Sequence, residues 1–134
     1  MAEGLLKNKL PEKTINSAGL RGMTGWTADP SSVRIMHQQG INISSHRAKN
    51  LTREMVINAD LILTMEEQQT RTVESRFPES RGKAMRLGEY SGYDIADPFN
   101  KGIDFFVLTF KLIEQGIEEL ISNKPELKTL NQDG

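Results

Sequence analysis

The residue best suited to chemistry is Asp97, which lies in the segment Asp94–Phe99 and is followed directly by a proline. A carboxyl group can donate or accept a proton, which is the chemistry that the Asp97 side chain could offer. An isolated Asp-Pro pair is also typical of a plain turn, and on its own it favours that interpretation. The ring of Phe99 can either stack on a flat substrate group or pack into the core. The segment alone leaves both interpretations open.

The composition excludes several other kinds of catalytic centre. The chain has no cysteine, so these residues contain no disulfide, no thiolate metal site and no cysteine nucleophile. The two histidines, His37 and His46, have no carboxylates at the spacing of a metal site, and we interpret His37 as a surface residue. The glycines at 19, 22 and 25 do not match the G-x-G-x-x-G pattern of a nucleotide-binding loop. We therefore expect no metal and no other cofactor.

Charge and hydropathy limit the partners. The 17 basic and 18 acidic residues give a net charge of -1, which offers no broad positive field to attract nucleic acid or an anionic membrane. No apolar run approaches the roughly 18 residues of a membrane span, and the first residues lack the pattern of a secretion signal. We expect a cytoplasmic protein that binds neither nucleic acid nor membrane.

Helical spacing of apolar residues, together with caps and breakers, predicts a series of helices. Asp29 and Pro30 form a typical helix start, Gly40 is suited to the position after a helix end, and Thr52 is a suitable cap. The expected helices cover residues 2–9, 30–39, a short stretch after Thr52 towards Ala59, 66–76, and a long final helix that carries an apolar stripe from Ile103 to Ile121.

Strands are predicted between these helices, at residues 14–17, 60–65 and 83–87. The consecutive apolar residues Leu61, Ile62 and Leu63 are typical of a central parallel strand that is covered on both faces. Alternating helices and strands predict an α/β fold with a three-layer, doubly wound parallel sheet. We expect one domain over residues 1–124 and a polar tail over residues 125–134. Because residues 1–6 already have helical character, we expect the first, central strand and its turn to be absent.

Short segments along nearly the whole chain together match one family. They are Met1–Glu3, Ser17–Gly19, Ala28–Pro30, Gly40–Ile41, His46–Ala48, Leu51–Thr52, Ala59–Met65, Arg81–Lys83 and Asp94–Phe99. In this combination the sequence resembles the low molecular weight protein-tyrosine phosphatases, especially the bacterial type associated with exopolysaccharide or capsule tyrosine kinases. The resemblance favours the catalytic interpretation of the Asp-Pro pair.

The resemblance implies roles for particular residues. Asp97 matches the general acid that protonates the leaving tyrosine oxygen and then helps water to hydrolyse the phosphoenzyme. Phe99 matches an aromatic position that stacks on the phosphotyrosine ring. Ser17 and His46 match polar residues that brace the phosphate loop. Trp26 lies away from the usual aromatic position of some relatives, so we interpret it as a packing residue of its loop and leave open whether it has a role in the site.

The sequence departs from the family at its start. Relatives carry a phosphate loop of Cys, five residues, Arg and Ser or Thr before a segment like Met1–Glu3, and this sequence has neither the nucleophile nor that arginine. We therefore expect a phosphatase family member that is inactive as written, with a phosphotyrosine protein such as a bacterial tyrosine autokinase as partner. The alternative is a non-catalytic module that binds phosphotyrosine or a kinase. Arsenate reduction, which also occurs on this fold, needs several thiols and is disfavoured.

Overall fold

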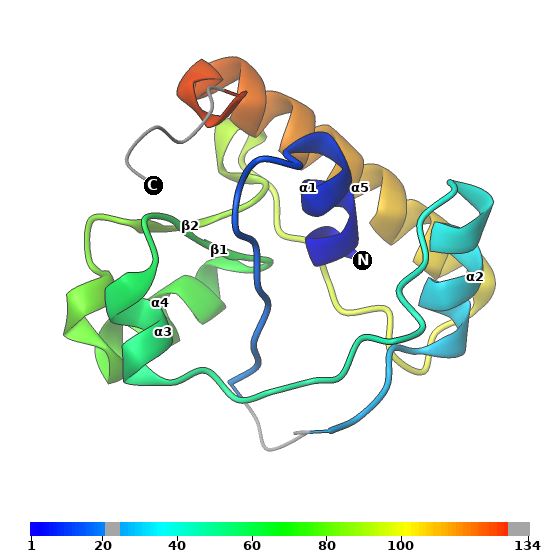
Figure 1. Ribbon diagram of the computed structural model, residues 1–134, viewed down its shortest axis with the longest axis horizontal. Coiled ribbons are helices and arrows are strands. Elements are labelled where there is room, and N and C mark those ends of the chain that lie inside the picture. Colours follow the sequence, from blue (N-terminus) through cyan, green and yellow to red (C-terminus); the bar gives the residue numbers. More distant parts are fainter. Residues whose placement is uncertain (21–24, 129–134) are drawn as a thin grey trace.

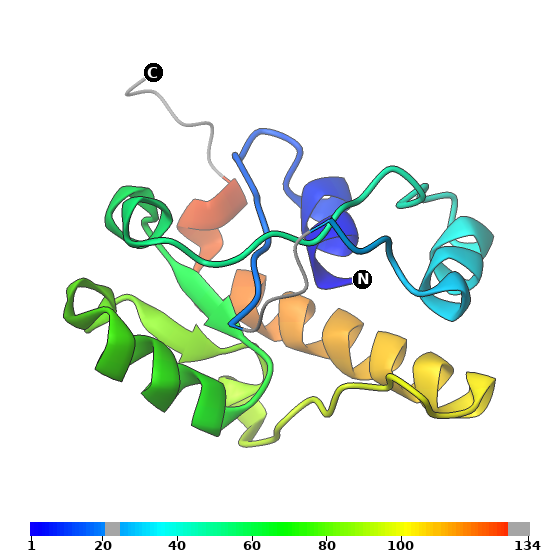
Figure 2. The ribbon, with the colours of Figure 1, turned by 90° about the horizontal axis from the view of Figure 1, so that it is seen from below.

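The computed structural model describes residues 1–20 and 25–128, and it forms three layers. Figures 1 and 2 show a small parallel sheet with α4 along one face and α5 on the other side, where α1 and α2 pack against α5. The predicted α/β class with a parallel sheet is confirmed. The helices are α1 (Ala2–Lys9), α2 (Pro30–Gln38), α3 (Arg53–Asn58), α4 (Glu67–Arg76) and α5 (Ile103–Asn123), with 3-10 turns at Pro78–Ser80, Glu89–Ser91 and Pro125–Lys128.

Two short strands form the sheet of the described residues. They are β1 (Ile62–Thr64) and β2 (Ala84–Arg86), and they pair in parallel. Successive side chains of β1 point to opposite faces, as pleating requires. Leu63 packs on the apolar core, whereas the Thr64 hydroxyl lies 2.6 Å from the hydroxyl of Thr70 in α4. Both faces of β1 are therefore covered, as its apolar sequence predicts.

The predicted strand at residues 14–17 is wrong. These residues are extended but belong to no strand, and pairing begins only at Gly19, which forms an isolated parallel bridge with Asn50. The Gly19 N–H donates to the Lys49 carbonyl at 2.8 Å, and the Leu51 N–H donates to the Gly19 carbonyl at 2.8 Å. A strand needs a neighbour to satisfy its backbone groups, and among the described residues the sheet has only β1 and β2.

The core is built around α5. Its inward face buries seven residues, which are Phe106, Thr109, Phe110, Ile113, Gly116, Ile117 and Leu120. Gly116 allows close packing against the end of β2, because a β-carbon there would lie 2.8 Å from Leu87 Cγ. In the first turns of α5 the predicted apolar stripe is not fully buried, since the side chains of Ile103 and Val107 are 41% and 38% exposed. No helix in the described parts of the chain is long and apolar enough to cross a membrane.

The predicted helix boundaries rest on local hydrogen bonds. Asp29 Oδ1 accepts a hydrogen bond from the Ser31 N–H at 2.8 Å and caps α2. The Thr52 hydroxyl accepts one from the Met55 N–H at 3.2 Å and caps α3. Gly40 has a φ of 77°, which is the left-handed conformation that favours glycine after a helix end. These three predictions are confirmed.

The region predicted as a polar tail begins with an ordered turn. Residues 125–128 form a 3-10 turn, and Leu127 packs against the apolar core. Residues 129–134 lie outside the described part of the chain. The domain boundary after residue 124 stays a prediction.

Candidate active site

Asp97 lies in an exposed loop between β2 and α5. Its Oδ1 accepts a hydrogen bond from the Phe99 N–H at 3.0 Å, which is the turn expected of an Asp-Pro pair. The loop then bends sharply at Asn100, whose φ of 62° lies in the left-handed region that asparagine tolerates better than most residues. The carboxyl group is therefore held in a local turn and remains accessible to a substrate.

Two aromatic residues considered for substrate contact, Phe99 and Trp26, are exposed. Phe99 is 54% exposed, which excludes the core-packing interpretation of its ring. Trp26 is 56% exposed, so its predicted role as a packing residue is wrong, although its carbonyl accepts a hydrogen bond from the Ala48 N–H at 2.8 Å. An exposed ring beside an exposed carboxyl group suits the recognition of an aromatic group that leaves with a proton.

The two predicted support residues meet at a side chain that the sequence analysis did not single out as a site residue. The Oε2 of Glu3, in α1, lies 3.3 Å from His46 Nδ1, and polar groups of Ser17 act on the same carboxylate by lowering its pKa. Lys7, one turn further along α1, lies 3.7 Å from the same oxygen. Glu3 is therefore the shared partner of Ser17 and His46. Its i,i+4 spacing from Lys7 is a visible signal, but only of a pair on one helix face.

The electrostatics of this cluster keep Glu3 ionised. Burial alone would raise the pKa of Glu3, but the Ser17 hydrogen bonds and the positive charges of Lys7 and His46 outweigh it and lower that pKa below its usual range. An ionised carboxylate can hold the Ser17 hydroxyl and the His46 ring in fixed orientations. The cluster joins the start of α1 to two loops that are distant in sequence.

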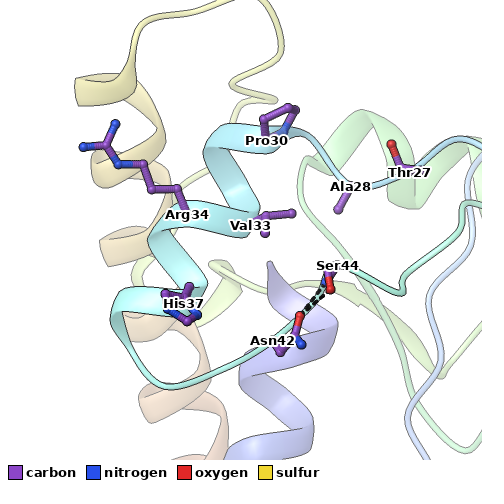
Figure 3. Close-up of a pocket in the computed structure, with 8 residues that line it drawn as sticks. All are labelled: Thr27, Ala28, Pro30, Val33, Arg34, His37, Asn42 and Ser44. Carbon is purple, nitrogen blue, oxygen red and sulfur yellow. Dashed lines mark hydrogen bonds between the residues drawn. The ribbon is translucent and has the colours of Figure 1, made fainter.

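A separate open groove of ≈ 660 Å³ lies beside α2 (Figure 3). Its lining residues are Thr27, Ala28, Pro30, Val33, Arg34, His37, Asn42 and Ser44. Ser44 is fixed by two hydrogen bonds to Asn42 Oδ1, and His37 is exposed, as predicted. Asp97 and Phe99 do not line this groove, so it is not the predicted site. This groove is therefore separate from the candidate proton donor.

Across residues 1–20 and 25–128, no three His, Cys, Asp or Glu side chains are grouped so that they could hold a metal ion. The chemistry available at the exposed loop is proton transfer by a carboxyl group beside an aromatic surface.

Comparison with known proteins matches almost the whole chain to one family. Residues 1–133 match the family described as low molecular weight phosphotyrosine protein phosphatase. A similar protein is the probable low molecular weight protein-tyrosine-phosphatase EpsP of Ralstonia nicotianae, which is 40% identical over 130 residues. That match covers 97% of this chain and 88% of EpsP.

Solved structures show the same fold. The tyrosine phosphatase Wzb from Escherichia coli K30, in complex with sulphate, superposes with a TM-score of 0.85 at 32% identity, covering 91% of this chain and 86% of that one. The arginine phosphatase YwlE of Bacillus subtilis, with a phosphorylated active-site serine, superposes with a TM-score of 0.87 at 28% identity, covering 97% and 90%. The structures that share this fold therefore include one named a tyrosine phosphatase and one named an arginine phosphatase.

Proposed function

The chain belongs to the low molecular weight phosphotyrosine protein phosphatase family, and on this premise we propose that it carries the proton-transfer and aromatic-recognition half of a phosphotyrosine hydrolase. The observation that carries the proposal is the exposed turn in which Asp97 and Phe99 are joined by a hydrogen bond of 3.0 Å. Asp97 is the general acid, and Phe99 stacks on the ring of the phosphotyrosine. Ser17 and His46, held by Glu3, brace the phosphate-binding loop.

The chemistry of Asp97 follows from the leaving group. When the phosphorus–oxygen bond breaks, the tyrosine oxygen gains negative charge, and a proton from the Asp97 carboxyl group neutralises it. The resulting carboxylate can then take a proton from the water that hydrolyses the phosphoenzyme. In the family the attacking atom is a cysteine sulfur, and these 134 residues contain no cysteine. We infer that they do not turn over substrate unless a Cys-x5-Arg segment is supplied.

An assay of p-nitrophenyl phosphate hydrolysis tests both statements. The 134-residue chain should show no turnover above the blank. The same chain extended at its N-terminus by a strand and a Cys-x5-Arg-Ser-Pro loop should hydrolyse the ester, and Asp97→Asn should lower kcat by about 10²–10⁴-fold. Asp104→Asn, a change at another exposed acid, is the matched control and should have little effect. Turnover by the unextended chain that Asp97→Asn abolishes would contradict the proposal.

The substrate class follows from the exposed ring. A flat tyrosine ring can stack on Phe99, whereas a phosphoarginine side chain, the substrate named for the relative YwlE, offers no aromatic ring. The extended chain should therefore prefer a phosphotyrosine peptide over a phosphoarginine peptide. Phe99→Ala should raise KM for the phosphotyrosine peptide, since stacking contributes about 0.5–1.5 kcal/mol. Faster hydrolysis of the phosphoarginine peptide would overturn this assignment.

A second candidate function is a non-catalytic module that binds phosphotyrosine or a kinase, and the exposure of Phe99 is the observation in its favour. Calorimetry of the 134-residue chain with a phosphotyrosine peptide separates the two. Saturable binding that Phe99→Ala removes would support the binding module. A flat titration is expected if the chain needs a phosphate loop to hold the dianion. For either function we propose a phosphotyrosine protein, such as a bacterial tyrosine autokinase, as the partner and the cytoplasm as the location.

A further inference from the structure

A second carboxylate, Asp94, lies three residues before Asp97 and holds two elements together. Its Oδ1 accepts a hydrogen bond from the Glu67 N–H at 2.9 Å and another from Arg86 Nη1 at 2.9 Å. Glu67 is the first residue of α4, so its N–H has no acceptor within the helix. A carboxylate at this position satisfies that donor and is favoured by the helix dipole.

The arginine in this contact is itself held in place. Arg86 ends β2, its side chain is 14% exposed, and its Nε lies 3.1 Å from Glu89 Oε1. The planar guanidinium therefore spans two carboxylates and presents its Nη1 to Asp94 in a fixed direction. Asp94 thereby connects the end of β2 with the start of α4.

The next residue is fastened as well. The Ile95 N–H donates to the Met65 carbonyl, just after β1, at 2.8 Å, and the Ile95 side chain is 1% exposed. Ala96, Asp97 and Phe99 are exposed, and the Asp97 side chain accepts a local hydrogen bond from the Phe99 N–H. The position of Asp97 therefore depends on the hydrogen bonds of Asp94 and Ile95, which we call the anchor of this loop.

We propose that Asp94 and Arg86 are positioning residues that fix the loop of the general acid to the ends of β1 and β2 and to the start of α4. The proposal rests on the proposed role of Asp97, but the anchor itself is measurable without catalysis. Its removal should loosen residues 94–99 and leave the core of α5 unchanged. Asp94 does not touch the substrate in this proposal and acts only through the loop.

Asp94 holds the anchor through its negative charge, so the charged groups around Asp94 determine the pH at which the anchor is lost. The charged groups around Asp94 are Arg86 and Glu89, together with Glu67, whose own carboxylate pairs with Arg71 at 3.1 Å. The Glu67 N–H, and then the Arg86 hydrogen bond, lower the pKa of Asp94 below its ordinary value of 3.8. The anchor is therefore present at neutral pH and is lost only when acid protonates Asp94.

Amide hydrogen exchange in the 134-residue chain tests the anchor. In Asp94→Ala, which removes the acceptor oxygen, exchange at Glu67 and Ile95 should become about ten-fold faster or more, while exchange at Ile117, in the core of α5, should stay the same. Glu67→Gln, which keeps the Glu67 N–H and the Asp94 carboxylate, is the matched control and should leave Ile95 unchanged. Unchanged exchange at Ile95 in Asp94→Ala, or an equal acceleration at Ile117, would overturn the positioning role.

A pH titration by NMR tests whether protonation of Asp94 is felt at Phe99. A general loss of stability would not produce this effect. In Asp97→Asn, where residue 97 no longer titrates, the Phe99 amide signal should show an inflection below the ordinary aspartate range. That inflection should vanish when Asp94→Asn is added and persist with Glu67→Gln. A signal that titrates in the same way without Asp94 contradicts the proposal. Both measurements are independent of turnover, so a failed phosphatase assay would refute the proposed function and leave the anchor standing.

Discussion

At the scale of single residues, one carboxylate explains why Ser17 and His46 belong together. Both match the family only through their flanks, and the sequence contains no signal that they meet. The structure brings them to Glu3, whose Oε2 lies 3.3 Å from His46 Nδ1 and whose pKa is lowered by Ser17. The contact depends on how the loops after α1 return to it, which is a property of the fold and not of local spacing.

Glu3→Gln should lower the free energy of unfolding by about 1 kcal/mol at pH 7, because a partly exposed charged group loses its ion pairs while solvent screens part of the effect. The pKa of Glu3 is lowered in the folded chain, so the stabilisation is present above the usual value of 4.5 and is lost as pH falls through the lower, folded-state pKa. Urea unfolding at pH 7 and pH 3 should show a difference between variant and parent only at pH 7. Glu118→Gln, an exposed change on α5, serves as control and should match the parent at both pH values.

At the scale of elements, α5 supplies the main apolar surface, and its two sides should respond very differently to truncation. Ile117 is 1% exposed and Leu108 is 50% exposed on the same helix. Ile117→Ala should lower the free energy of unfolding by about 2–5 kcal/mol, because it removes buried methyl groups and leaves a cavity. Leu108→Ala, the matched control, should change it by less than about 0.5 kcal/mol. Urea unfolding of the chain extended by a strand and phosphate loop measures both, and equal losses would show that the assigned face of α5 is wrong.

The start of α2 offers a test of capping. Asp29→Ala removes the acceptor of the Ser31 N–H and should lower the free energy of unfolding by about 1 kcal/mol. Asp29→Asn keeps a side-chain oxygen at the same place and should stay close to the parent. Urea unfolding of the two variants side by side separates loss of the cap from loss of charge. A destabilisation of the same size in both would point to charge and not to the cap.

Local signals predicted the elements better than their partners. Caps and helical spacing placed α2, α3, α4 and α5, because the interactions that define them lie within a few residues in the chain. The segment at residues 14–17 has a strand-like composition, yet it forms no strand, since strand formation depends on a distant neighbour. The sequence also contained no signal for the contact of Asp94 with Arg86 and Glu67, because the three residues lie in a loop, in β2 and in α4.

At the scale of the whole molecule, β1 is paired on one side only among the described residues. The Ile62 N–H donates to the Lys83 carbonyl, and the Thr64 carbonyl accepts a hydrogen bond from the Leu87 N–H. Because alternate residues of a strand point to opposite sides, the Leu63 N–H and carbonyl face away from β2. An edge of this kind is a site for pairing with another strand and a weak point of the sheet.

We predict that the 134-residue chain is at best marginally stable, because two strands of three residues give the sheet little support of their own. Its thermal unfolding, followed by circular dichroism at several protein concentrations, should be broad and lie below the roughly 45–65 °C typical of mesophilic domains. The chain extended by an apolar strand and phosphate loop should melt more sharply and at higher temperature, since a strand beside Leu63 would satisfy the open edge. A sharp, concentration-independent transition of the unextended monomer within the typical range would show that the two-stranded sheet and α5 suffice for a stable fold.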